Sequence, residues 1–135
     1  MQIYRGDHQQ NFTINHHNSS RYGINVLFFA TNIKLARLYA IHHSRKRAIY
    51  KGGFVYQAEI PDYIKQIDFG GGTSYGRELR DIVMQHHKTT AAIQIYNILD
   101  YPSKNLLVPN PSDVIAIFDF SIIKNLAILE SHVKL

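Results

Sequence analysis

Cysteine is absent from this chain of 135 residues. Disulfide bonds, a thiolate nucleophile and any zinc or iron–sulfur site that requires sulfur ligands are therefore excluded. Long apolar runs are missing as well, since none approaches the ~20 residues that a helix needs to cross a bilayer. Polar residues follow Met1 at once, so we expect no signal peptide, no membrane partner and a soluble, cytoplasmic protein. Secretion into a host is compatible with the same features.

Charged residues are scarce too, at 19% of the chain, whereas hydrophobic residues make up 45% and aromatic residues 12%. This composition is typical of a folded protein and not of a disordered polypeptide. The length is enough to enclose one sizeable core but too short for two, so we expect a single domain over residues 1–135.

The pattern of apolar residues predicts strands and helices in an irregular order. Short apolar or alternating runs predict strands at 2–6, 25–31, 54–60, 91–99, 114–118 and 126–129. Helical spacing predicts one helix from Thr31 or Asn32 to about Arg47, and a second helix that ends near His87. Polar connections join them at 7–21, 69–74 and 100–112. Because strands outnumber helices and do not alternate with them, the predicted class is α+β with antiparallel pairing.

Basic residues exceed acidic ones, which gives a formal charge of +5 at pH 7. Such a bias favours an anionic partner, which could be nucleic acid, a phosphorylated cofactor or an acidic protein surface. The densest basic run is Ser-Arg-Lys-Arg at 44–47. Runs of this kind are more often solvated helix ends than nucleic-acid sites.

Three segments carry recognisable motifs in a fixed order. The first is Ile3-Tyr4-Arg5-Gly6, the second is GINVLFFATNIKLARLYA at 23–40, and the third spans 92–125, with IYNILD at 95–100 and SDVIAIFD at 112–119. Together they resemble the ADP-ribosyltransferase superfamily, especially its small phage-associated and effector-associated members. In that family an Arg or His beside a glycine on the first strand contacts the dinucleotide, and a Glu follows a Tyr-x-Asn strand.

The resemblance implies a fold, an activity and a co-substrate. The fold would be two small antiparallel sheets packed around an NAD-binding cleft with flanking helices. The activity would be NAD-dependent mono-ADP-ribosylation of a macromolecule, a glycosyl transfer used by toxins, effectors and counter-defence proteins. A protein acceptor is favoured over a nucleic acid.

Asp100 and Arg5 are the catalytic candidates. Cleavage of the nicotinamide–ribose bond develops positive charge on the ribose, which a nearby carboxylate stabilises. Asp100 takes the place of the family's usual Glu, and Glu78 on the second helix is an alternative acid. An equally open reading of Asp100 is a turn or cap residue before Pro102. Arg5 has a planar donor fork that suits a pyrophosphate or ribose hydroxyl groups.

The remaining candidates would hold the dinucleotide. Phe29 and Tyr39 would flank the nicotinamide ring, since a flat ring binds well between aromatic faces. The full set of cofactor-binding candidates is Tyr4, Arg5, Gly6, Phe29, Thr31, Tyr39 and Asn97.

Two other functions stay open at the level of sequence. One is a catalytically inactive module that contacts protein or nucleic acid through its basic face. The other is transfer of a phosphate from RNA to NAD⁺, which would require basic residues to converge on the cleft. The His-His pairs at 16–17, 42–43 and 86–87 lack an accompanying ligand spacing, so we expect no metal site.

Overall fold

The computed structural model describes residues 1–14, 22–49, 51–74, 76–100, 102 and 112–134. Its strands are β1 (Gln2–Asp7), β2 (Leu27–Ala30), β3 (Gly53–Glu59), β4 (Lys65–Asp68), β5 (Ala92–Ile98), β6 (Ser112–Ile117) and β7 (Lys124–Val133). Its helices are α1 (Ile33–Lys46), α2 (Arg77–His86) and a 3₁₀ turn, η2 (Phe120–Ile122). Most of the predicted connections at 7–21 and 100–112 lie outside the described residues.

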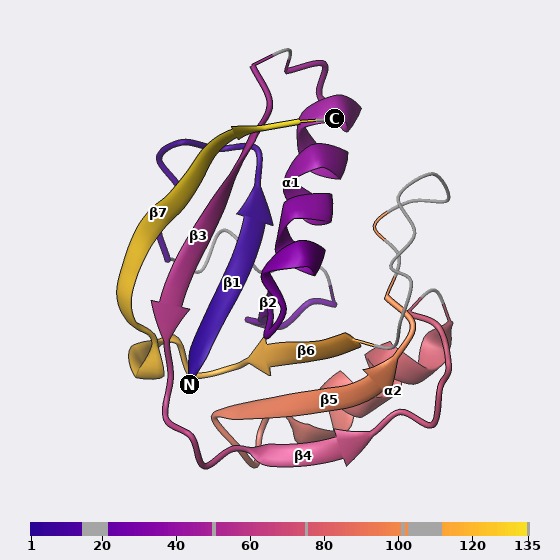
Figure 1. Cartoon of the computed structure of the whole chain (residues 1–135). Helices are drawn as coiled ribbons and strands as arrows, with labels where there is room; N and C mark the ends of the chain where they lie inside the picture. Colours follow the sequence, from indigo (N-terminus) through magenta and orange to yellow (C-terminus); the bar gives the residue numbers. More distant parts are fainter. Residues whose placement is uncertain (15–21, 50, 75, 101, 103–111, 135) are drawn as a thin grey trace.

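All seven strands belong to one sheet, in the order β4-β5-β6-β2-β1-β3-β7. The pairs are antiparallel except β4 with β5, which run parallel. Strands β4 to β6 cross the direction of β1, β3 and β7, so the sheet is sharply bent (Figure 1). The expectation of an α+β fold with two small antiparallel sheets around a cleft is therefore wrong: the chain forms a single mixed sheet and is mostly β.

Strand β2 is the reason that the sheet is continuous. One of its edges pairs with β6 over four positions, from Leu27 to Ala30, and its other edge meets β1 where Tyr4 lies opposite Ala30. A short strand that pairs on both sides joins what would otherwise be two separate sheets. The pattern of apolar residues in a sequence does not specify which strands are partners, so this link was missed.

Local sequence patterns predicted most of the strands and both α-helices, and they missed β4. Asn32 caps α1, with its side-chain oxygen accepting a hydrogen bond from the Lys34 amide at 2.8 Å, as one of the two predicted caps. Strand β4 was not predicted because it is short and exposed along most of its length, and therefore has no apolar pattern to read. Strand β7 extends well beyond the predicted 126–129.

Helix α1 lies unusually close to the sheet. A Cβ atom at Gly6 would overlap the Ala36 carbonyl and the Ala40 amide, and one at Gly53 would overlap the Ala40 carbonyl. Glycine on the strands and alanine on the helix therefore let the two backbones approach. This contact holds the C-terminal half of α1 beside the end of β1, where the candidate site lies.

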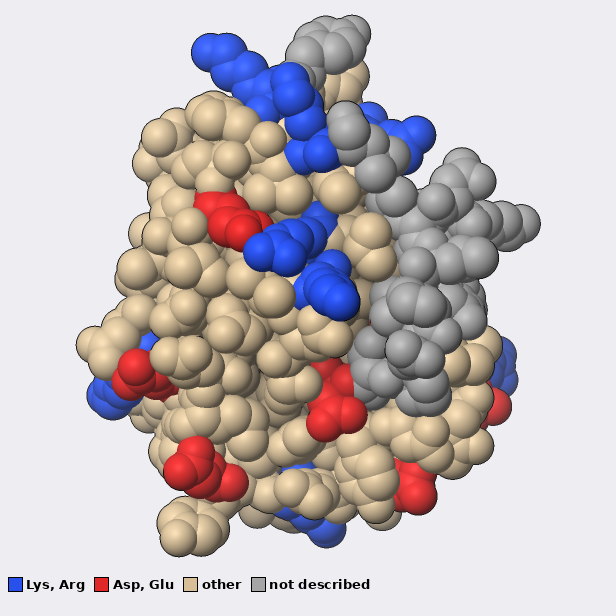
Figure 2. Space-filling model, in the orientation of Figure 1, with Lys and Arg blue, Asp and Glu red and all other residues tan. Residues whose placement is uncertain are grey.

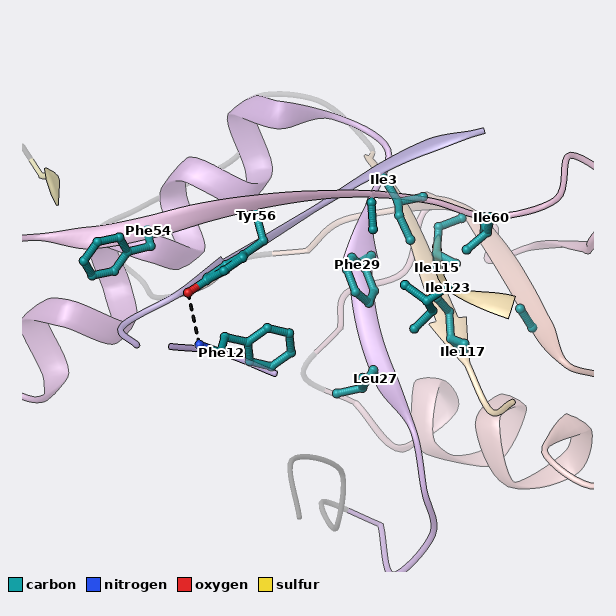
Figure 3. Close-up of a cluster of buried hydrophobic side chains, with 12 residues drawn as sticks. Ile3, Phe12, Leu27, Phe29, Phe54, Tyr56, Ile60, Ile115, Ile117 and Ile123 are labelled. Carbon is teal, nitrogen blue, oxygen red and sulfur yellow. Dashed lines mark hydrogen bonds between the residues drawn. The ribbon is translucent and has the colours of Figure 1, made fainter. Parts of the chain in front are cut away.

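The opposite face of β1 and β3 carries the largest group of buried aromatic and aliphatic side chains. Ile3, Leu27 and Phe29 pack there with residues of β3 and β6 (Figure 3). The Tyr56 hydroxyl accepts a hydrogen bond from the Phe12 amide at 3.1 Å and donates one to the Gln9 carbonyl. These bonds hold residues 9–12 against the sheet next to Arg5.

Within the parts of the chain that the structure covers, no helix combines the length and apolar character of a transmembrane span.

Candidate active site

A pocket of about 490 Å³ opens between β1, β2 and the inner face of α1. This volume is within the range of small-molecule sites. Six of the eight catalytic and cofactor-binding candidates line it, namely Tyr4, Arg5, Gly6, Phe29, Tyr39 and Asp100. Asp100 is far along the chain from the other five, and the bent sheet brings all six together.

Asp100 is buried in this pocket, with only 5% of its surface exposed. Its Oδ1 accepts a hydrogen bond of 2.7 Å from the Tyr39 hydroxyl. Buried aspartate is rare in proteins unless it has hydrogen-bond partners, and the Tyr39 hydroxyl is such a partner.

The position of Asp100 is set by the end of β5 and the glycine loop. Leu99 pairs with Thr73 in an isolated parallel bridge, and its amide donates to the Gly72 carbonyl at 2.8 Å. The Ser74 amide donates to the Leu99 carbonyl at 3.0 Å. Residues 70–74 thus extend the pairing of β4 with β5 and lead directly to the pocket wall.

Arg5 lies between the pocket and the core. Its guanidinium Nη1 donates to the Phe28 carbonyl at 2.8 Å, and its Cζ lies 4.9 Å from the centre of the Phe12 ring. Nε makes no hydrogen bond to any described residue and lies 3.5 Å from Asp7 Oδ2. Burial lowers the pKa of Arg5, and Asp7 opposes that shift; the side chain remains a cation because arginine titrates far above neutral pH.

His43 follows Tyr39 by one helical turn and stacks against it, with ring centroids 5.8 Å apart and an interplanar angle of 30°. Residues four apart share one face of a helix, so both side chains face the pocket. Burial lowers the pKa of His43 to about 4, and the neighbouring His42 and Arg5 add to the shift while Asp7 opposes it. The imidazole is therefore neutral at pH 7.

Phe28 and Phe29 both line the pocket, but they belong to different groups of packed side chains. Phe29 is 3% exposed and its ring packs in the core (Figure 3). Phe28 is half-buried and packs with Tyr39 in the cluster on the other side. Successive side chains of a strand point to opposite faces, so Phe28 is better placed to contact a planar ligand.

Three residues considered from the sequence do not line the pocket. The Thr31 backbone amide donates to the Asp113 carbonyl at 3.3 Å. Asn97 has a left-handed φ of 59° at an irregularity of β5 and donates from Nδ2 to Asp68 Oδ1 at 3.3 Å, so it braces the glycine loop. Glu78 is exposed at the start of α2.

Sequence reasoning did not assign His42, His43, Lys46 and Ser74 to the site, although all four line the pocket. The first three follow Tyr39 by three, four and seven residues, which is the spacing of one helical face. That spacing was the signal that could have identified them. Among the described residues, no three or more His, Asp or Glu side chains lie close enough to hold a metal ion, and His16 and His17 lie outside those residues.

Comparison of the chain with protein-family models and with curated proteins found no match. The case for a function therefore depends on the pocket itself.

Proposed function

We propose that this pocket binds NAD⁺ and that the protein transfers ADP-ribose from NAD⁺ to a macromolecule. The resemblance of the three sequence motifs to ADP-ribosyltransferases suggests the reaction. The observation that carries the proposal is Asp100, a buried carboxylate hydrogen-bonded to Tyr39 in the same pocket as Arg5.

The chemistry requires a negative charge near the ribose. When the C–N bond between ribose and nicotinamide breaks, the electron pair leaves with nicotinamide and positive charge develops on the ribose carbon. A fixed carboxylate in a site that excludes water stabilises that charge more strongly than water would. The bond then forms between this carbon and a nucleophile of the acceptor, which loses its proton.

The other lining residues fit the remaining parts of NAD⁺. Phe28 and Tyr39 present aromatic surface for a flat nicotinamide ring. Arg5 and Lys46 place cationic side chains at the pocket wall, which suits the pyrophosphate. One acid, one aromatic wall and one basic wall therefore match the ribose, the nicotinamide ring and the pyrophosphate of NAD⁺.

Release of nicotinamide from NAD⁺ by the purified protein tests the proposal, with cell lysate as a source of acceptor. Asp100→Asn keeps the shape of the side chain and removes its charge. Loss of one such electrostatic contact in an active site typically lowers the rate by about 10²–10³-fold. Asp81→Asn on the exposed face of α2 makes the same chemical change outside the pocket and should leave the rate unchanged.

Thermal denaturation with NAD⁺ gives an independent measurement of binding. A bound ligand stabilises the folded state in proportion to the logarithm of its concentration. A rise in melting temperature without nicotinamide release would support NAD⁺ binding and reject ADP-ribose transfer. If NAD⁺ neither raises the melting temperature nor releases nicotinamide, the proposal is rejected entirely.

A second candidate is a non-catalytic module that contacts an anionic protein or nucleic acid. Arg45, Lys46 and Arg47 are exposed at the C-terminal end of α1. Lys and Arg side chains gather over the upper part of the face shown in Figure 2, near that end of the helix. A salt-sensitive partner that binds wild-type and Asp100→Asn protein equally would favour this candidate.

A further inference from the structure

A second, smaller pocket of about 160 Å³ adjoins the first on the side of β1 that leads into residues 8–12. Arg5 and His43 line both pockets. Asp7, His8, Gln9, Phe12 and Arg47 complete the smaller one. The two hollows are therefore adjacent parts of one cleft, with a guanidinium and an imidazole between them.

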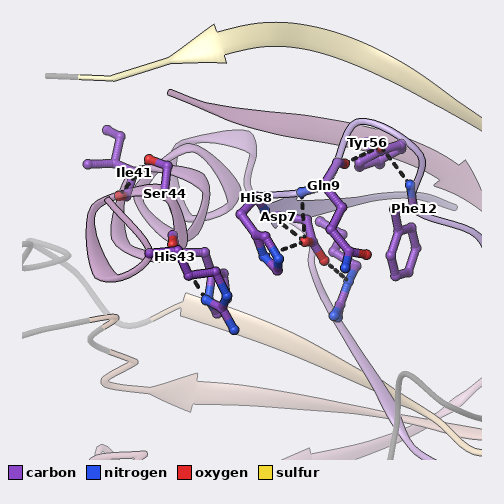
Figure 4. A network of polar contacts seen from close by, with 10 residues as sticks. Asp7, His8, Gln9, Phe12, Ile41, His43, Ser44 and Tyr56 are labelled. Atoms are coloured by element: carbon purple, nitrogen blue, oxygen red, sulfur yellow. Dashed lines mark hydrogen bonds and ion pairs between the residues drawn. The ribbon is translucent and has the colours of Figure 1, made fainter. Parts of the chain in front are cut away.

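Basic groups approach the smaller pocket from two separate elements. Arg5 comes from β1 and His8 directly follows that strand, whereas His43 and Arg47 come from the end of α1. The rings of His8 and His43 have centroids 6.4 Å apart. Figure 4 shows His8 and His43 on neighbouring segments, with Asp7 beside His8.

Asp7 does not make this pocket acidic, because its carboxylate is already engaged. Oδ1 accepts hydrogen bonds from the backbone amides of His8 at 2.7 Å and Gln9 at 3.1 Å. The same oxygen lies 3.1 Å from His8 Nδ1, and Oδ2 lies 3.5 Å from Arg5 Nε. Asp7 therefore orients the basic groups, and among the lining residues that the structure describes, two arginine charges against one carboxylate give an excess of one positive charge.

Ligand chemistry follows from this geometry. A phosphate group has several oxygens that accept hydrogen bonds from different directions, and arginine binds it through charge-assisted bonds. Imidazole nitrogens also donate to phosphate, and they become stronger donors when protonated. A pocket of about 160 Å³ has room for a phosphate or a pyrophosphate group, and it is smaller than the pockets that hold whole small-molecule ligands.

We propose that the smaller pocket is a phosphate subsite in which Arg47 and His8, together with Arg5 and His43, hold a phosphate group beside the dinucleotide pocket. The phosphate belongs either to the pyrophosphate of NAD⁺ or to the acceptor. This assignment rests on the proposed function in one respect only, which is that the ligand of the neighbouring, larger pocket is NAD⁺. Binding of the anion itself does not require NAD⁺ cleavage.

Titration of the intact protein with inorganic pyrophosphate, followed by isothermal calorimetry, tests the subsite. Arg47→Gln should weaken pyrophosphate binding roughly tenfold, because one charge-assisted contact is lost. Arg45→Gln is the matched control: it removes the same charge from the same end of α1, but Arg45 does not line the pocket. The control should change the affinity less than twofold.

Two results would overturn the proposal. Equal weakening by Arg47→Gln and Arg45→Gln would mean that pyrophosphate senses only the general surface charge. Failure of wild-type protein to bind pyrophosphate at millimolar concentration would mean that no subsite exists. Circular dichroism of both variants checks that α1 is intact, and His8→Gln provides a second variant that removes no permanent charge.

Competition distinguishes the two sources of the phosphate. If the pocket holds the pyrophosphate of NAD⁺, inorganic pyrophosphate displaces NAD⁺ and Arg47→Gln weakens both ligands. If it holds a phosphate of the acceptor, NAD⁺ and pyrophosphate bind together, and a phosphorylated oligonucleotide displaces pyrophosphate alone. Either result supports the subsite. Pyrophosphate binding without nicotinamide release would reject the proposed ADP-ribose transfer and leave the phosphate subsite supported.

Discussion

The hydrogen bond between Tyr39 and Asp100 joins the middle of α1 to the segment that follows β5. Aspartate has a shorter side chain than the glutamate found in the family that the motifs resemble, so its reach depends on how it is held. The phenol fixes one oxygen of the carboxylate, and the stacked ring of His43 fixes the phenol. The pair therefore acts as one preorganised unit.

Tyr39→Phe removes the hydroxyl group and keeps the aromatic ring. Asp100 then loses one hydrogen-bond donor in a buried position, which costs about 1–3 kcal/mol. We expect nicotinamide release to fall roughly 10–100-fold, with NAD⁺ affinity less affected. Tyr63→Phe is the control, because Tyr63 is 98% exposed. Full activity in Tyr39→Phe would show that the hydroxyl does not position Asp100.

His43 gives the folded protein a defined dependence on pH. Its pKa is about 4 in the folded state and about 6.5 in an unfolded chain. Between these values the unfolded chain binds a proton that the folded protein does not, so stability falls as pH decreases from 6.5 to 4 and is constant above that window. The pKa values of His42 and His8 are lowered mainly by burial, in the same direction.

Chemical denaturation at pH 7.5 and pH 4.5 measures this effect. His43→Gln should lose less stability between the two pH values than wild type does. His132→Gln serves as a comparison, since His132 is exposed at the end of β7. If His43→Gln loses as much stability between the two pH values as wild type does, a group other than His43 takes up the proton that destabilises the protein.

At the scale of elements, the approach of α1 to β1 decides whether the pocket exists. Tyr39, His42, His43 and Lys46 reach the pocket from α1 because the helix backbone lies directly on Gly6. Glycine at position 6 is therefore required by the packing of α1, in addition to its proposed contact with the dinucleotide.

Gly6→Ala should therefore destabilise the protein by more than about 2 kcal/mol, because the new methyl group meets helix backbone that cannot move alone. Gly76→Ala is the matched substitution: there the new methyl group meets the end of the flexible Glu78 side chain, and the cost should be small. The difference in melting temperature between the two variants is the measurement. Similar values would mean that α1 shifts on the sheet at little cost.

At the scale of the whole molecule, the order of strands predicts where the sheet opens first. Strand β6 is central between β5 and β2, and Ile115 and Ile117 are fully buried. Strands β4 and β7 are the two edges. Hydrogen–deuterium exchange should therefore be slowest in β6 and fast in β4 and along the outer edge of β7. Exchange in β6 as fast as in β4 would contradict the single-sheet arrangement.

Much of this molecule could be predicted from local sequence, and its long-range arrangement could not. The run Val26-Leu27-Phe28-Phe29 indicated a strand, and Asn32 with the apolar positions after it indicated α1. The polar strand β4 had no such signal, and nothing in β2 indicates that it pairs with both β1 and β6. The predicted fold class was wrong because the pairing partners of β2 could not be read from the sequence.

The candidate site divides in the same way. Arg5, Tyr39 and Asp100 were selected from separate motifs and lie in one pocket, although their chemical roles remain proposals. His43 was not assigned to the site, although its helical spacing from Tyr39 placed it on the same face of α1; its position beside Arg5 comes from the packing of α1 on Gly6. Phe29 was selected and lines the pocket, but Phe28 was not, since the run of apolar residues does not tell which of two neighbours has its ring in the core.

The position of Arg5 and His43 on the walls of both pockets has a thermodynamic consequence. A ligand that draws these side chains toward one pocket changes what the other pocket presents, so the two binding free energies cannot be independent. Linkage is reciprocal: whatever factor the first ligand contributes to the affinity of the second, the second contributes to the first. The sign of that factor determines whether the two ligands bind in cooperation or exclude each other.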